Sequence, residues 1–485
     1  MIGRGLLFVP GTVRKSDYCA RMKSFTLSLA LSFALLPLAG CAVGGASQAA
    51  SMLAMHDEHP VQVAALVVDM DTGETLLARD AQRLFRPAST QKLLATSAIC
   101  RRDPDGEFVT SLSTSALPEG TVTLIACGDP MLSTTEVRGM TRELRSRGLT
   151  KATTEVRVVD ALRDAPRFGE GWMWDDEPDS FSPVLSAACI DGGCVTVEAT
   201  RGNGKPTVRL VPVSGELRVQ VQTQEGDLQT TRGRYQQPNL VTITGRVPED
   251  LVVRQRITVP DAARYTGYIL ADALRRDGAL AGKPSVIVTT RAPGTSQRKG
   301  EVQLRRSVAD VVTHTNKVSD NLGAEMLLRR LGTLDTASTP LGLDSYRFGV
   351  AAITADLQQL GFGASQFRIA DGSGVSHYNL VSADLLVRLL LDMHQRGGRS
   401  YELFRDSLPI AGVDGTLASR MKNSPAAHRV RAKTGTVSAV SNLAGYIETR
   451  SGRRLAFAIL CQNFVGSPKP WRDLQDRVCA ALANM

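Results

Sequence analysis

Two apolar-rich segments near the start of the chain, Val61 to Asp69 and Glu74 to Arg79, are separated by the tripeptide Asp71-Thr72-Gly73. Segments of this length and composition predict strands, and a Gly-containing polar tripeptide between them predicts a tight turn. We therefore expect the fold to begin with two antiparallel strands.

A second pair of strands is expected near the C-terminus. Hydrophobic and polar positions alternate from Thr436 to Ile447, and a second strand-like run extends from Leu455 to Cys461 after the turn-forming residues Arg450-Ser451-Gly452. Alternation with a period of two residues is typical of a strand with one buried face. These two segments predict a hairpin at the edge of a sheet.

Two helices are predicted from the pattern of apolar residues. Lys92 to Ile99 is an apolar run that follows Arg86-Pro87-Ala88-Ser89, and Leu322 to Leu331 is amphipathic. Because Pro87 sets the entry to the first helix, Ser89 is expected in its first turn. Free N–H groups and the helix dipole favour a developing negative charge at that position.

The stretch from 102 to 298 differs from the rest because it is rich in short alternating segments. Such segments predict a mostly β region. They are Thr121 to Ile125, Glu155 to Val159, Val195 to Ala199, Thr207 to Val211, Leu217 to Val221 and Leu240 to Thr244.

The first chemical motif is Ser89-Thr90-Gln91-Lys92. A spacing of three residues places Ser89 and Lys92 on one helix face, where the amine can reach the hydroxyl. A lysine takes the proton of a serine only if burial or a second cation lowers its pKa, and Lys433 is the natural second cation. The pair predicts a nucleophilic serine with a lysine base.

Two more motifs follow along the chain, Ser319-Asp320-Asn321 and Lys433-Thr434-Gly435. Ser319 and Asn321 precede the amphipathic helix, from which they can supply a proton relay and an amide clamp. Together with the first motif, they form the set typical of penicillin-interacting serine enzymes and predict a serine acyl-transfer site.

The K-T-G motif is expected to lead into the edge hairpin. Gly435 leaves room for a substrate backbone to lie alongside the strand. The N–H groups of Thr436 and Ser89 are expected to form an oxyanion hole.

Length and composition fit a globular protein of two or three domains. The chain has 485 residues, of which 43% are hydrophobic, so a sizeable core is available. Part of the net charge of +9 belongs to a basic N-terminal leader. The mildly basic remainder fits either a preference for anionic cell-wall polymer or a solvated surface, and no partner nucleic acid is predicted.

The N-terminal leader predicts export. Phe25 to Leu38 is apolar but too short for a secure membrane span, and Leu38-Ala39-Gly40-Cys41 has the pattern of a bacterial lipobox. Residues 1–41 are interpreted as a signal peptide whose expected initiator is Met22.

Cys41 would then be the lipidated first residue of the mature protein. No aspartate follows it, so in a Gram-negative cell we expect a periplasmic lipoprotein anchored to the outer membrane. The alternative is an ordinary signal cleaved near Ala46 to Ala50, which would release a soluble periplasmic protein.

Six cysteines lie outside the leader, and an exported protein can oxidise them. Cys189 with Cys194 is the first candidate disulfide and Cys461 with Cys479 the second, although sequence does not fix the pairing. The cysteines and histidines form no metal-binding spacing, so no metal and no cofactor are expected.

Seven motifs in sequence order identify a family resemblance. They are Arg86-Pro87-Ala88-Ser89, Gly128-Asp129-Pro130, Gly171-Trp172-Met173-Trp174-Asp175-Asp176, Lys317-Val318-Ser319-Asp320-Asn321, Asp371-Gly372-Ser373-Gly374-Val375-Ser376, Gly412-Val413-Asp414-Gly415-Thr416-Leu417 and Ala432-Lys433-Thr434-Gly435-Thr436. From about Val61 to the C-terminus, the chain resembles the D-alanyl-D-alanine carboxypeptidase/endopeptidase family, the class C low-molecular-mass penicillin-binding proteins.

The resemblance implies an α+β fold. A catalytic domain similar to penicillin-binding proteins and serine β-lactamases, with an antiparallel sheet flanked by helices, would comprise residues 51–101 and 299–485. Residues 102–298 would form one or two accessory domains inserted between the first two active-site motifs.

The resemblance also implies a mechanism and a substrate. Ser89 would attack a D-Ala-D-Ala bond in a peptidoglycan stem peptide, Lys92 would accept its proton, and Ser319 would pass a proton to the leaving amine. Asn321 would hold the substrate amide, while Lys433 and Thr434 would receive the terminal carboxylate. Penicillin and other β-lactams would acylate the same serine.

Specificity is where the chain departs from the family pattern. Asp176 and Phe181 match residues that help to line a pocket for the diaminopimelate side chain. His377 stands where an arginine usually pairs with the side-chain carboxylate, and a histidine offers less charge and no bidentate fork. Ser438 stands where some relatives carry a longer amide, so recognition of diaminopimelate is open.

Other functions use the same residues. A β-lactamase or esterase would differ in how fast the acyl-enzyme is hydrolysed, but no candidate deacylating glutamate is evident. A non-catalytic cell-wall-binding lipoprotein would not need Ser89, Lys92 and Lys433 intact. Seen alone, Ser89 or Asn321 would be read as a helix cap.

Overall fold

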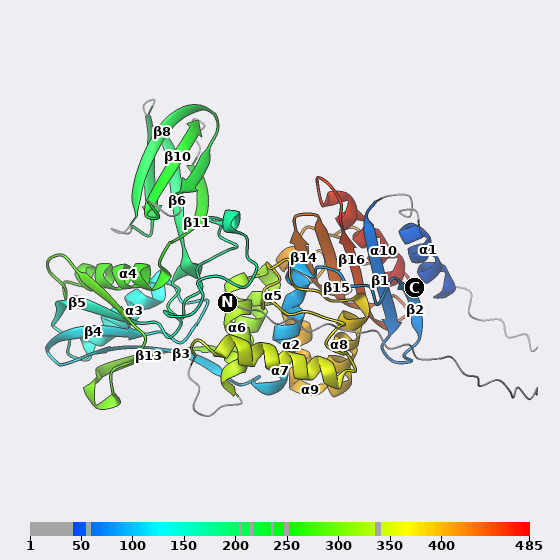
Figure 1. Cartoon of the computed structure of the whole chain (residues 1–485), viewed down its shortest axis with the longest axis horizontal. Coiled ribbons are helices and arrows are strands. Elements are labelled where there is room, and N and C mark those ends of the chain that lie inside the picture. The colour runs from blue at the N-terminus through cyan, green and yellow to red at the C-terminus, as the bar shows by residue number, and fades with distance from the viewer. Residues whose placement is uncertain are drawn as a thin grey trace, which may run out of the picture. The chain divides into compact units, whose positions relative to one another are not determined.

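The structure is a computed structural model that describes residues 42–54, 60–202, 205–213, 217–233, 237–246, 252–334 and 341–485. They all belong to the unit Cys41–Met485, whose helices and strands are labelled in Figure 1. The predicted signal peptide, its initiator Met22 and the lipidation site Cys41 lie outside the described residues. No helix in the described part of the chain is long and apolar enough to cross a bilayer.

The central feature is a five-stranded antiparallel sheet in the order β14-β15-β16-β1-β2. All residues of β1 after the first are buried, because helices cover both faces of the sheet. The strands are β1 (Gln62–Asp69), β2 (Thr75–Arg79), β14 (Val430–Val437), β15 (Val440–Glu448) and β16 (Arg454–Gln462).

Two helices, α10 (Lys469–Ala483) and α1 (Ala42–Ala54), share an apolar cluster with one face of this sheet. Ala49 and Leu53 of α1 are buried in that cluster. Gly45 lies so close to the C-terminus that a Cβ on it would fall 2.4 Å from the Cγ of Met485. The first described helix is therefore part of the folded core.

The other face of the sheet packs against a layer of helices, in which α8 contacts β1, β15 and β16. The layer contains α2 (Lys92–Arg102), α5 (Val308–Val318), α6 (Asn321–Leu334), α7 (Ser345–Gln359), α8 (Ala383–Arg396) and α9 (Gly398–Ser407). An antiparallel sheet between helices confirms the predicted α+β class.

Between α2 and α5 the chain forms a second five-stranded sheet in the order β12-β5-β4-β3-β13. Its parallel pairs, β4 with β5 and β5 with β12, need crossover connections, and α3 (Thr134–Ser146) and α4 (Ala262–Arg276) lie in these connections. The strands are β3 (Glu107–Thr114), β4 (Glu119–Ile125), β5 (Lys151–Val159), β12 (Ser285–Thr289) and β13 (Lys299–Ser307).

Two three-stranded sheets, β8-β10-β9 and β11-β6-β7, come between β5 and α4 in the sequence. They contain β6 (Cys194–Gly202), β7 (Lys205–Val211), β8 (Arg218–Asp227), β9 (Gln229–Arg232), β10 (Leu240–Arg246) and β11 (Val252–Thr258). The insertion is mostly β as predicted, and each of the six alternating segments overlaps a strand. Helices α3 and α4 were not predicted.

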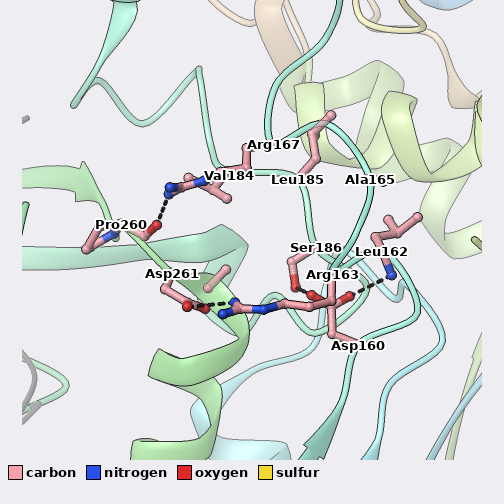
Figure 2. A pocket seen from close by; sticks show the side chains of 11 residues that line it. Asp160, Leu162, Arg163, Ala165, Arg167, Val184, Leu185, Ser186, Pro260 and Asp261 are labelled. Atoms are coloured by element: carbon pink, nitrogen blue, oxygen red, sulfur yellow. Dashed lines mark hydrogen bonds and ion pairs between the residues drawn. The ribbon is translucent and has the colours of Figure 1, made fainter. Parts of the chain in front are cut away.

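A long loop leaves the end of β5 and returns to the same place (Figure 2). Buried Asp160 accepts hydrogen bonds from Ser186 Oγ and from the Ala187 N–H, both at 2.8 Å. Arg163 pairs with Asp261, the N-cap of α4, at 2.7 Å. The loop 161–185 is therefore tied at its base, and it carries the G-W-M-W-D-D motif.

The K-T-G motif lies within a strand, not ahead of one as predicted. β14 includes Lys433 to Gly435, and the strand-like run from Thr436 is divided between β14 and β15 by a turn at Ser438 and Ala439. Ala439 adopts a φ of 60°, a value for which turns normally use Gly or Asn. The sequence therefore gave no turn signal there.

Both expected disulfides are absent from the structure, because the six cysteines in its described part are free thiols. The thiol of Cys189 donates to the Val184 carbonyl at 3.5 Å, whereas that of Cys194 donates to the Gly192 carbonyl at 3.4 Å. Cys461 and Cys479 are buried in the apolar cluster of β16 and α10. They pack there as small apolar side chains.

Candidate active site

Ser89 and Lys92 meet at the start of α2. Ser89 lies in a 3-10 turn, Ala88–Gln91, that leads directly into this helix. The Lys92 Nζ is 2.9 Å from Ser89 Oγ, and the Lys92 side chain is completely buried. The three-residue spacing thus produces the contact that the sequence predicted.

The Lys92 amine has two further acceptors from distant parts of the chain. Its Nζ donates to Asn321 Oδ1 and to the Ser373 carbonyl oxygen, both at 2.6 Å. Together with Ser89 Oγ, these groups engage all three N–H bonds of a protonated lysine.

Burial lowers the pKa of Lys92 to about 8, while the carboxylates of Asp371, Asp320 and Glu325 act in the opposite direction. Burial and not a second cation is therefore the main cause of the shift. The pKa of Lys433 also lies well below its ordinary value, because Lys433 is buried and lies near Lys92. A buried amine with a lowered pKa can act as a base near neutral pH.

The S-D-N motif connects α5 to α6. Ser319 ends α5 with a left-handed φ of 62°. Asp320 accepts hydrogen bonds from the N–H groups of Leu322 and Gly323, so it caps α6. The Asn321 side chain is not the cap, and its Nδ2 donates to the carbonyl of Phe181 at 2.6 Å.

Lys433 forms a second amine–hydroxyl pair. Its completely buried Nζ donates to Ser319 Oγ at 2.9 Å and to the Thr434 carbonyl at 3.0 Å. The structure therefore places two groups side by side at one site, Ser89 with Lys92 and Asn321, and Ser319 with Lys433, which lies near Lys92.

Gly435 is needed for a different reason from the one predicted. A Cβ at this position would lie 2.6 Å from the Pro87 carbonyl oxygen and 3.1 Å from the Ser89 nitrogen. The space that it leaves is filled by the turn that carries Ser89, not by a substrate backbone. The exposed Thr436 follows on the edge strand β14, next to that turn.

The G-V-D-G-T-L motif links the second and third motifs. Asp414 pairs with Lys317 of α5 at 2.7 Å. Thr434 Oγ1 donates to Thr416 Oγ1 at 2.9 Å. This motif therefore holds α5 and β14 in place around the site.

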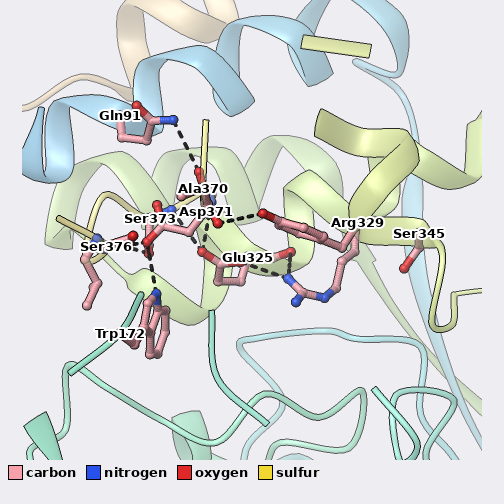
Figure 3. A network of polar contacts seen from close by, with 12 residues as sticks. Gln91, Trp172, Glu325, Arg329, Ser345, Ala370, Asp371, Ser373 and Ser376 are labelled. Carbon is pink, nitrogen blue, oxygen red and sulfur yellow. Dashed lines mark hydrogen bonds and ion pairs between the residues drawn. The ribbon is translucent and has the colours of Figure 1, made fainter. Parts of the chain in front are cut away.

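The D-G-S-G-V-S loop packs against the turn that carries Ser89, and Figure 3 shows the polar contacts within and around the loop. Buried Asp371 accepts hydrogen bonds from the N–H groups of Gly374 and Ser376, both at 2.7 Å, and from Trp172 Nε1 at 2.9 Å. Gly374 has a φ of 83°, and a Cβ there would lie 1.8 Å from the Ala88 carbonyl oxygen. Trp172 is therefore anchored to the site and is not ordinary accessory-domain core.

The predicted specificity residues are only partly brought together. Burial, then Arg86, lowers the pKa of His377, while Asp176 raises it, so His377 and Asp176 are electrostatic neighbours. Phe181 is 45% exposed, and its carbonyl accepts from Asn321. Ser438 is exposed in the β14–β15 turn.

Sequence reasoning missed two charged residues beside the site. Arg472 of α10 is exposed and donates to Thr436 Oγ1 at 3.3 Å, which places a cation at the outer end of the K-T-G strand. Glu325 of α6 is fully buried below the D-G-S-G-V-S loop. The only signal for Glu325 was an acidic residue on the apolar side of a predicted helix.

Comparisons with known proteins identify the family of the chain. The profile of the D-Ala-D-Ala carboxypeptidase 3 (S13) family matches residues 47–485. A D-alanyl-D-alanine carboxypeptidase from Actinomadura sp. strain R39 is 30% identical over 444 residues, which cover 86% of this chain and 80% of the relative.

Solved structures show the same fold. Penicillin binding protein 4 from Haemophilus influenzae superposes with a TM-score of 0.77 at 20% identity, covering 91% of this chain and 99% of its own. The same protein complexed with a β-lactam superposes with a TM-score of 0.70 at 19% identity and the same coverage.

The reactivity of Ser89 should follow the protonation of Lys92. With the neutral Lys92 amine as the base and a pKa of about 8, the rate of acylation is expected to rise about tenfold per pH unit below pH 8 and to level off above it. Stopped-flow reaction with an activated ester over pH 6–10 measures this profile. A rate independent of pH over this range would contradict a lysine base.

Proposed function

Because the chain belongs to the D-Ala-D-Ala carboxypeptidase 3 (S13) family and is a peptidase, we propose that it is a serine-type D-Ala-D-Ala carboxypeptidase that works through a Ser89 acyl-enzyme. The observation that carries the proposal is the contact of the buried Lys92 amine with Ser89 Oγ at 2.9 Å. A serine in contact with a buried amine is an activated nucleophile.

In the proposed reaction, Ser89 Oγ attacks the carbonyl of the penultimate D-Ala of a peptidoglycan stem peptide while Lys92 takes its proton. The N–H groups of Ser89 and Thr436 hold the oxyanion. Ser319, held by Lys433 at 2.9 Å, passes a proton to the leaving amine. Water then hydrolyses the ester and releases Ser89.

The terminal carboxylate of the substrate is assigned to the outer part of the K-T-G strand. Lys433 is buried and donates to Ser319, so it does not reach outward. Thr434 Oγ1 donates to Thr416 Oγ1, so Thr436 supplies the hydroxyl donor here, and Arg472, 3.3 Å from Thr436 Oγ1, supplies an accessible positive charge. A carboxylate next to the scissile bond matches this set of donors.

The same site suits two related reactions. A DD-endopeptidase cleaves a cross-link whose acyl part is also a D-alanine, so it needs the same nucleophile and clamp. β-Lactams acylate such serines, and penicillin binding protein 4 from Haemophilus influenzae, which shares the fold, has been solved with one. We therefore include endopeptidase activity and penicillin binding in the proposal.

The first test is labelling with fluorescent penicillin, with D-alanine release from a pentapeptide followed in parallel. Ser89→Ala should abolish both, because the nucleophile is lost. Ser97→Ala, which removes another buried hydroxyl from α2, should keep both. Rapid loss of label with antibiotic turnover would favour a β-lactamase, and no label with no release would leave a cell-wall-binding protein.

The second test concerns the role of His377 in recognition of the diaminopimelate side chain. Burial lowers its pKa, so at pH 7 it is neutral and binds a carboxylate weakly. His377→Arg should raise kcat/KM for substrates with a free diaminopimelate side-chain carboxylate by roughly tenfold, the scale of one charge-assisted hydrogen bond. The amidated substrate is the control and should not change. An equal kcat/KM in the variant for the free acid would place His377 outside the pocket.

We also propose that the mature protein is a periplasmic lipoprotein of the outer membrane, modified at Cys41. The support is the lipobox sequence together with α1, which begins at Ala42 and buries Ala49 and Leu53 in the core. Cleavage near Ala46 to Ala50 would cut into this helix and remove part of its packing.

The mass of the mature protein isolated from a Gram-negative host tests this proposal. We expect an N-terminal peptide that begins at Cys41 and carries diacylglycerol, and its loss in Cys41→Ala. An unmodified N-terminus between residues 46 and 50 would show that the protein is released in soluble form.

A further inference from the structure

A buried ion pair lies directly below the D-G-S-G-V-S loop. Glu325 and Arg329 are one turn apart on α6, and Glu325 Oε2 is 2.8 Å from Arg329 Nη1. Glu325 is 0% exposed and Arg329 is 4% exposed. Such a pair is costly to desolvate and is often no more stabilising than two apolar side chains. A contribution to folding stability therefore does not explain why the pair is there.

The second oxygen of the same carboxylate holds the loop. Glu325 Oε1 accepts hydrogen bonds from the N–H of Gly372 at 2.9 Å and from the N–H of Ser373 at 3.0 Å (Figure 3). The loop also touches the helix backbone, because a Cβ on Gly372 would lie 2.7 Å from the Ala324 carbonyl oxygen. The Gly372–Ser373 peptide group, which directly precedes the one that carries the Ser373 carbonyl, is therefore fixed relative to α6.

The Ser373 carbonyl is one of the three acceptors of Lys92, at 2.6 Å. A neutral lysine has two N–H bonds and one lone pair. The Ser373 carbonyl and Asn321 Oδ1 can only accept, so they hold the two N–H bonds, and the lone pair is left to point at Ser89. A shift of either acceptor would turn the lone pair away from the hydroxyl.

We propose that Glu325, held by Arg329, is a positioning residue that fixes the Ser373 carbonyl and so aims the base at the nucleophile. The inference rests on the proposed serine mechanism and assigns Glu325 and Arg329 a part in it. Neither residue touches the reacting atoms, and both act through the backbone of the loop.

Several charged or titratable groups surround this point from different elements. α2 contributes Lys92, α6 contributes Glu325 and Arg329, Asp320 directly precedes α6, the loop contributes Asp371, and β14 contributes Lys433. From α7, the ring of Tyr346 lies 5.5 Å from the Arg329 guanidinium. Because Glu325 raises the pKa of Lys92, neutralising Glu325 alone should move the titration of Lys92 to lower pH.

Two variants test the proposal through the second-order rate constant for acylation by fluorescent penicillin between pH 6 and 10. Glu325→Leu combined with Arg329→Leu removes the charges and the acceptor together, and the pH-independent rate should fall about 10- to 100-fold because the base is misaligned. Glu325→Gln keeps an acceptor for the loop. Its rate should stay within about threefold, with a midpoint at lower pH.

Asp356→Asn is the matched control. Asp356 is a buried carboxylate on α7 that pairs with Arg101 and Arg102 at the far end of α2. Its loss should lower the melting temperature and leave both the acylation rate and its pH midpoint unchanged.

A folded Leu double variant that acylates at the wild-type rate would overturn the proposal, as would a Glu325→Gln variant whose pH-independent rate falls as far as that expected for the double variant. If circular dichroism shows that the double variant does not fold, the pH-independent rate of Glu325→Gln decides alone. If the wild-type protein takes no label, the proposed function itself is contradicted. This outcome differs from failure of the positioning role, in which the wild-type protein is labelled.

Discussion

The burial of one amine governs this site. Lys92 is removed from water, where an ammonium ion is expensive to keep charged. Three acceptors and the field of three carboxylates reduce that cost without abolishing it, so its pKa settles near 8. A lysine that is more exposed would stay protonated, and one with fewer acceptors would have no fixed direction for its lone pair.

The rest of the fold supplies those acceptors from separate places. Ser89 comes from the same turn as Lys92, Asn321 from the start of α6, and Ser373 from a loop fixed by Asp371 and Glu325. The insertion also takes part, because Trp172 donates to Asp371 and the Phe181 carbonyl accepts from Asn321. Since the loop 161–185 is tied at its base by Asp160, its contacts with the site need little additional ordering.

Local rules made much of this predictable from the sequence. The S-x-x-K spacing fixes a contact within one helix turn, and the order of the three motifs, with the family resemblance, indicated which residues meet. Backbone groups carry no such signal. No residue pattern distinguishes the Ser373 carbonyl from other backbone carbonyls. Glu325 is far from Ser373 in the sequence, and only the folded chain brings the two residues together. Thus the chemistry was predicted, whereas the groups that orient the base were not.

Errors in the predicted fold have physical causes as well. The strand boundary after K-T-G was missed because Ala439 adopts a left-handed conformation that favours other residues. Gly435 was assigned to substrate access, but its role is to let β14 approach the turn that carries Ser89. The role of Gly435 depends on how two distant segments approach each other, which the residue pattern along one segment does not show.

Titration of the Lys92 amine itself tests the central claim most directly. Proteins with ¹³C-labelled lysine side chains, compared with a Lys92→Met variant for assignment, report its protonation by NMR. We expect a Lys92 signal that titrates near pH 8 and vanishes in the variant. A signal that titrates near the ordinary lysine value of 10.5 would contradict a buried amine as the base of this site.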